Sequence, residues 1–164
     1  MKKLTALFSA ILLITGLSCK KSQTSTSTSL TVTVTDGRTG SPAAGASVYL
    51  YNSAAAVTGN SPQYTATTDQ SGKANITVAF VSQYFVVAQN ATEKNYYNGL
   101  IPIGIFTTQT DIQDSPAQTP AGVIGGVKFK DTNGDGAITA ADDGPPPAAS
   151  ITANTSNSFS TAIY

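Results

Sequence analysis

Oxygen-bearing side chains recur at a fixed spacing between residues 131 and 142. Counted from Asp131, they stand at positions 1, 3, 5, 9 and 12, and Gly136 takes position 6. A calcium ion takes about six to eight oxygen ligands, and a loop that turns sharply at its sixth residue brings such groups to one point. The spacing predicts a Ca²⁺ site whose ligands are Asp131, Asn133, Asp135, the carbonyl of Ala137, Thr139 through a water, and Asp142.

This twelve-residue stretch resembles the calcium loop of EF-hands, and its terminal Asp142 resembles the loop of dockerins, which also favour Asp there. Its flanks do not resemble a helix-loop-helix unit. Residues 127–130 alternate as a strand does, and Gly144 followed by three prolines stops any helix that begins near Thr139. The resemblance therefore implies a structural site, because the two helices that a calcium sensor moves are missing. The alternative is a solvated Asn/Gly/Asp turn without a metal.

Cys19 is the only cysteine, and it follows a short apolar segment. Lys2 and Lys3 precede an apolar run over residues 4–17, which is shorter than the roughly 20 residues that a membrane-spanning helix needs. The pattern resembles a bacterial lipoprotein signal, which implies removal of residues 1–18 and acylation of Cys19. Acyl chains would anchor the protein in the cell envelope, with the outer membrane expected, facing the periplasm or the exterior. The alternative is an ordinary signal peptide with an incidental cysteine.

Composition argues against catalysis and against nucleic-acid binding. The chain has no histidine, which removes the commonest general base, and its one thiol is the predicted lipid attachment site. Without the signal, seven basic residues face nine acidic ones, and they form no basic stripe. We therefore expect a protein that is not an enzyme.

Alternation of apolar and polar residues predicts strands over most of the remaining chain. A Ser/Thr-rich tether is expected at 19–29, and the strands are expected at 30–35, 46–52, 64–68, 73–80, 84–89, within 96–107, at 127–130 and at 158–164. Many short strands separated by turns favour an antiparallel sandwich. No helical periodicity is visible after residue 20.

The segments 34–48, 68–74 and 84–88 resemble the carboxypeptidase regulatory-like, or prealbumin-like, domain. This resemblance implies an all-β, Greek-key sandwich over residues 30–115 that serves as a non-catalytic accessory or cell-surface unit. Residues 121–164 would form a second β segment that carries the calcium loop. Because this segment has too few strands to stand alone, it would pack on the first domain, extend its sheet or pair with another molecule.

Two functions follow from these expectations. The first is a structural or protein-interaction lipoprotein with a partner in the cell envelope. The second is a surface glycan-binding lipoprotein, in which sugars stack on exposed rings such as Tyr49, Tyr51, Tyr96 and Tyr97. Tyr96 and Tyr97 are neighbours, so a strand would point them to opposite faces. The absence of tryptophan makes the glycan function the weaker of the two.

Overall fold

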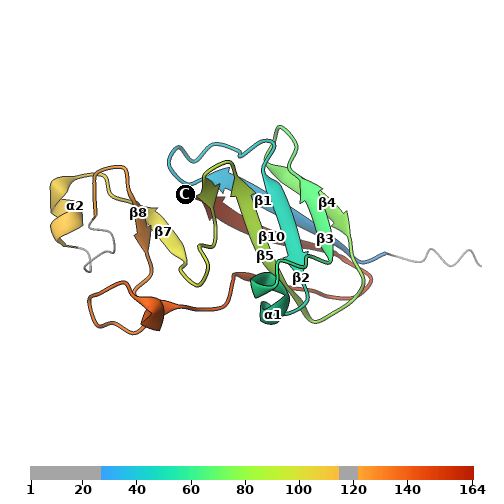
Figure 1. The fold of residues 1–164 in the computed structure, drawn as a ribbon. Helices are drawn as coiled ribbons and strands as arrows, with labels where there is room; N and C mark the ends of the chain where they lie inside the picture. The colour runs from blue at the N-terminus through green and yellow to red at the C-terminus, as the bar shows by residue number, and fades with distance from the viewer. Residues whose placement is uncertain (1–26, 115–121) are drawn as a thin grey trace, which may run out of the picture.

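The computed structural model describes residues 27–114 and 122–164. The predicted signal segment, Cys19 and most of the tether lie outside the described residues. Strands account for 41% of the structure and helices for 10%, which confirms the all-β class. Figure 1 shows a β-sandwich with a smaller, irregular unit beside it.

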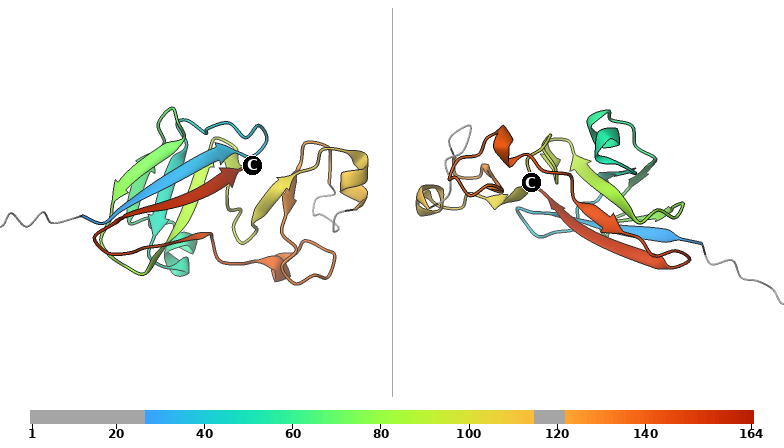
Figure 2. Two further views of the ribbon diagram at one scale, coloured as in Figure 1. Left: turned by 180° about the vertical axis from the view of Figure 1, so that it is seen from behind. Right: turned by 90° about the horizontal axis from the view of Figure 1, so that it is seen from below.

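The sandwich consists of two sheets that face each other (Figures 1 and 2). The first sheet has the order β10-β1-β4, with β1 at Ser29–Asp36, β4 at Lys73–Thr77 and β10 at Ser156–Ile163. The second has the order β3-β2-β5-β6, and β9 also pairs with β5. Its strands are β2 at Ser47–Tyr51, β3 at Tyr64–Thr67, β5 at Gln83–Asn90, β6 at Glu93–Lys94 and β9 at Ala148–Ser150.

Period-two alternation places one face of each sheet in a shared core. Leu30, Val32 and Val34 of β1 are fully buried, and they pack with Val48 and Leu50 of β2. From β5, Tyr84 adds a buried ring whose hydroxyl donates a hydrogen bond to the carbonyl of Ala79 at 2.9 Å. Burial of such side chains removes apolar surface from water, which is the main favourable term in folding.

The C-terminal strands belong to both sheets of this sandwich. Ala149 and Ile163, from β9 and β10, are members of the same core cluster as β1 and β5. The expected boundary between 30–115 and 121–164 therefore does not coincide with an edge of the sandwich. Of the three arrangements left open for the second segment, the structure has the one in which it extends the sheets.

One pairing departs from the expected antiparallel pattern. β10 runs parallel to β1 over eight residue pairs, from Ser29↔Ser156 to Asp36↔Ile163, whereas the other pairings are antiparallel. The chain leaves β9 in one sheet and turns at residues 152–155 into the other sheet. There, Asn157 donates to the carbonyls of Ser29 and Thr152, at 3.0 and 3.1 Å. This crossing makes β10 run parallel to β1. The alternation of apolar and polar residues in a sequence does not predict the direction of a strand.

The smaller unit is an insertion between β6 and β9. It contains the antiparallel pair β7 at Pro102–Ile105 and β8 at Val127–Phe129, the helix α2 at Gln109–Gln113 and the 3₁₀ turn η1 at Ala140–Asp142. A further helix, α1 at Ala54–Thr58, follows β2. Each of the two α-helices has five residues. That length is too short to produce a helical stripe in the sequence.

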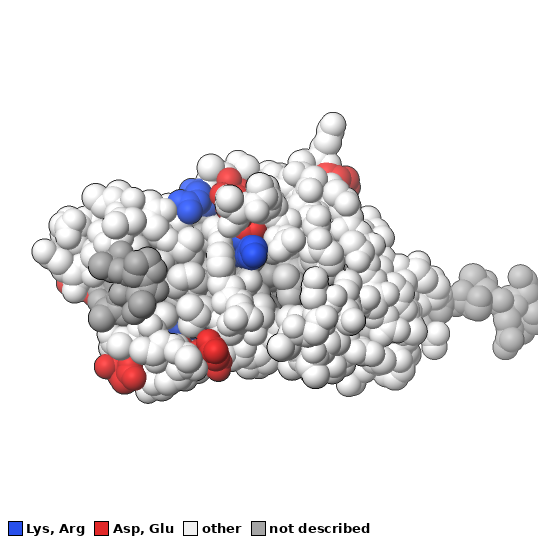
Figure 3. Space-filling model, in the orientation of Figure 1, with Lys and Arg blue, Asp and Glu red and all other residues white. Residues whose placement is uncertain are grey.

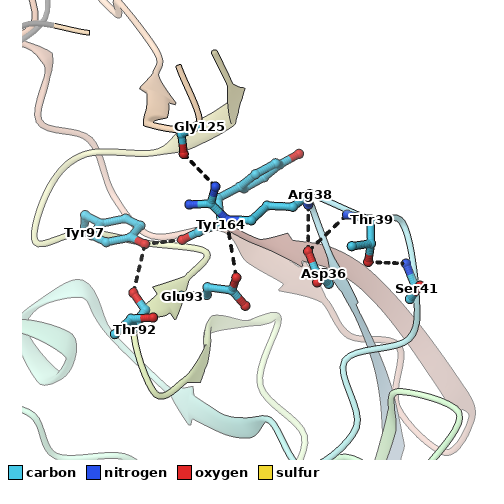
Figure 4. Close-up of polar contacts among 9 residues, drawn as sticks. All are labelled: Asp36, Arg38, Thr39, Ser41, Thr92, Glu93, Tyr97, Gly125 and Tyr164. Carbon is cyan, nitrogen blue, oxygen red and sulfur yellow. Dashed lines mark hydrogen bonds and ion pairs between the residues drawn. The ribbon is translucent and has the colours of Figure 1, made fainter. Parts of the chain in front are cut away.

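Arg38 and Tyr97 hold the insertion against the sandwich (Figure 4). Arg38 donates to the carbonyl of Gly125 at 2.6 Å, and its Nε lies 3.4 Å from the Glu93 carboxylate. The Tyr97 hydroxyl donates to the main-chain carbonyl of Tyr164, and its ring meets Phe129 edge-on at 5.4 Å between centroids. Within residues 27–114 and 122–164, no helix is long and apolar enough to cross a membrane.

Ile163→Ala tests whether the C-terminal strand is part of the sandwich core. Ile163 is fully buried, so we expect the variant to lose about 2–5 kcal/mol of unfolding free energy in urea denaturation. Ser158→Ala, at an exposed position of the same strand, should change that free energy by less than about 0.5 kcal/mol. Equal stability of the two variants would contradict a core role for β10.

Candidate calcium loop and tyrosine groove

Residues 131–142 form a closed loop that leads from β8 into η1. The Asp131 carboxylate accepts hydrogen bonds from the backbone of Gly134 at 2.6 Å and Gly136 at 2.9 Å. Both glycines have positive φ, at 75° and 83°, which side chains rarely allow. These bonds fold the first half of the loop around Asp131, as the sequence spacing predicts.

The next two polar residues form successive tight turns. Asn133 accepts the Asp135 backbone N–H at 3.0 Å, and Asp135 accepts the Ala137 N–H at 2.8 Å. The Asn133 amide also donates to the second oxygen of Asp135 at 2.9 Å. Side-chain oxygens at these alternate positions therefore order the backbone locally.

Asp142 closes the loop from its other end. It is a buried carboxylate, only 2% exposed, and it accepts backbone N–H groups from Thr132 and Thr139, each at 2.8 Å. Thr139 in turn caps η1, so Thr139 and Asp142 form a capping box. The hydrogen bond from the Thr139 backbone is the main cause that lowers the pKa of Asp142, against desolvation, which raises it.

These contacts can be compared with what a calcium ion needs. A carboxylate offers about four lone-pair sites, and the backbone bonds from Gly134 and Gly136 occupy two at Asp131, so acceptor capacity remains there. However, no group of three or more His, Cys, Asp or Glu side chains gathers at one point among the described residues. The loop is therefore ordered through its predicted ligands, and the metal site itself stays a prediction. The predicted lipid site, Cys19, lies outside the described residues.

Three of the four tyrosines noted in the sequence line a groove on the outer face of the second sheet. Tyr49 and Tyr51 alternate with the core residues of β2, so both lie on the side of the sheet away from the core. Tyr49 is half-buried and stands opposite Val87 of β5, whereas Tyr51 is only 3% exposed. Tyr96 forms part of the opposite side. Tyr97 does not line the groove, because it packs into the junction with the insertion, as expected for one of two adjacent residues.

Polar residues that the sequence did not single out complete this groove. Gln89 and Lys94 pair across β5 and β6 at its floor, Asn60 follows α1, and Asn98 occupies a turn with φ of 49°. The groove has a volume of about 480 Å³. The sequence predicted only the alternation of Tyr49 and Tyr51 with the core residues of their strand, because the other lining residues come from segments distant in sequence.

Asp142→Asn tests the role of the buried carboxylate in chelator-treated protein. The pKa of Asp142 is lower in the folded protein than in the unfolded chain, where it is about 4. The ionised carboxylate therefore stabilises the fold above the unfolded pKa, and this contribution is lost as the pH falls through the folded-state pKa. We expect the variant to be less stable than wild type at pH 7, with the difference shrinking as the pH falls below the unfolded pKa. Urea denaturation across this range measures it, and a difference that stays constant with pH would contradict it.

Comparison with family models, curated proteins and solved structures gives no match for this chain. Neither the calcium loop nor the tyrosine groove therefore takes a role from a relative. The roles proposed for them depend on the residues and the geometry described above.

Proposed function

We propose that this protein is a non-catalytic, lipid-anchored protein of the bacterial cell envelope whose β-sandwich acts as a structural or protein-interaction module. The observation that carries the proposal is the ordered loop at 131–142, which connects β8 of the insertion to β9 of the sandwich. Acylated Cys19 would hold the module at the outer membrane, and the Ser/Thr-rich tether would keep it off the surface. A Greek-key, prealbumin-like topology stays a prediction.

Calcium would stabilise this connection. The carboxylates of Asp131, Asp135 and Asp142 carry negative charge within one short loop, and a bound cation would reduce their mutual repulsion. Further oxygen ligands would come from Asn133 and the Ala137 carbonyl, with Thr139 holding a water. Coordination would require these groups to turn toward a common centre while the backbone bonds of Asp131 and Asp142 keep the loop folded.

Exposed apolar side chains on the insertion support a protein partner. Ile103 is 58% exposed, and Val123 and Ile124 are each 63% exposed. Large apolar groups at the surface favour contact with another protein when they lie close enough to form a patch. An envelope protein is the expected partner, because the lipid anchor would keep this module at the membrane.

Calcium titration of the chain that begins at Cys19 tests the metal site. We expect one-site binding by calorimetry and a gain in unfolding free energy of about 2.7 kcal/mol when free calcium is about one hundred times Kd. The double variant Asp131→Asn and Asp135→Asn should lose both effects, because it removes two charges from the loop. Asp114→Asn, an acidic residue outside the loop, should retain both. Absence of binding heat in wild type, with equal melts in calcium and in chelator, would refute the site.

Cys19→Ser tests the anchor. In a bacterial host fed with labelled palmitate, wild type should carry the label and partition into the membrane fraction, because the acyl chains provide the apolar attachment. The serine variant should lose the label and fail to be processed as a lipoprotein. Unlabelled wild-type protein free in the medium would contradict lipid anchoring.

A further inference from the structure

We propose that the groove on the outer face of β2, β5 and β6 binds a saccharide. The half-buried rings of Tyr49 and Tyr96 supply aromatic surface in this groove, the buried Tyr51 packs beneath it, and Gln89 and Asn98 supply amides. This site lies outside the calcium loop, and its ligand does not depend on whether the loop binds a metal.

The dimensions of the groove suit a small ligand. Its volume of about 480 Å³ falls within the range of roughly 300–1,000 Å³ that is typical of small-molecule sites. The floor comes from rigid strands, with α1 and the residues after it on one side and the 96–98 turn on the other. Figure 1 shows α1 over this face of the sheet, and Figure 2 shows it on the side remote from β1 and β10.

Two of the rings are held in place before any ligand arrives. The Tyr51 hydroxyl donates to the side-chain oxygen of Asn60 at 3.3 Å, and the Tyr96 hydroxyl donates to the carbonyl of Gly144 at 3.1 Å. Burial is the main cause that raises the pKa of each of these tyrosines, so both hydroxyls stay protonated as donors at neutral pH. Preorganised rings reduce the entropy lost on binding.

The mixture of groups matches the two kinds of surface on a sugar. A pyranose ring presents a face of C–H groups, which can lie on an aromatic ring, and a rim of hydroxyls, which donate and accept hydrogen bonds. The amides of Gln89, Asn60 and Asn98 offer both donors and acceptors for such hydroxyls. A purely apolar ligand would leave these polar groups without partners, which costs free energy.

Charge narrows the choice of ligand. Lys94 is the only charged residue among those described as lining the groove, and no ion pair involves it within the described part of the chain. One lysine that makes no ion pair there accommodates either a neutral sugar or one that carries a carboxylate. A single lysine is too few for nucleic acid, which calls for a basic patch. Much of the face seen in Figure 3 is likewise uncharged.

The test is a glycan array that includes neutral and uronic-acid oligosaccharides, followed by calorimetric titration of the saccharide that binds best. Both are run with calcium and with chelator, so that failure of the calcium loop is distinguished from failure of the groove. Tyr49→Ala should weaken binding at least about tenfold, whereas Tyr49→Phe, which keeps the ring, should stay within about threefold of wild type. Phe80→Ala removes an exposed ring outside the groove and should leave affinity unchanged.

Asn98→Gly gives a second, independent measurement. Asn98 is exposed at the rim and has a φ of 49°, which glycine also adopts, so this variant should keep the turn, lose the amide and bind more weakly. This variant decides the outcome if Tyr49→Ala is unstable. Binding of no saccharide in either condition, or equal affinity of wild type and Asn98→Gly, would overturn the proposal.

Discussion

The fold depends on a single apolar core that lies between two sheets and draws on both ends of the described chain. β1 begins at Ser29 and β10 ends at Ile163, and their parallel pairing closes the first sheet over the second. Without β10, Val32 would lose its cross-strand neighbour Phe159, the core would lose Ile163, and β1 would become an edge strand. A sheet edge exposes unpaired backbone groups. Long-range closure of this kind carries a loop-entropy cost, which burial of the core offsets.

That closure also explains how an irregular insertion can exist between β6 and β9. The chain leaves the sandwich after Lys94 and returns at Ala148, and both points lie in the second sheet. The insertion therefore needs only to span two fixed positions, and it adds local contacts at the junction. Arg38 and Tyr97 provide these contacts from opposite sides of the junction, and the end of β10 takes part because Tyr164 accepts from Tyr97.

The strands and turns that depend on neighbouring residues could be predicted from the sequence. The strand pairing and the groove, which depend on distant residues, could not be predicted in full. The strands 30–35 and 84–89 and the turns at Asp131 and Gly136 follow from local alternation and backbone geometry. The parallel partner of β1 could not be predicted, since alternation fixes which face of a strand is buried but leaves its neighbour open. For the same reason, only part of the groove could be predicted from the sequence. Tyr49 and Tyr51 were recognised on one strand, whereas Lys94 and Asn98 reach them only through tertiary pairing.

The loop at 131–142 and the groove are connected through two glycines. Two residues after Asp142, Gly144 donates its N–H to the carbonyl of Gly99 at 2.9 Å, and its own carbonyl accepts the Tyr96 hydroxyl. Gly99 has φ of 112°, and a Cβ there would lie 2.2 Å from the Asp143 carboxylate, so this close approach requires glycine. The exit of the loop thus supports the wall that carries Tyr96 and Asn98.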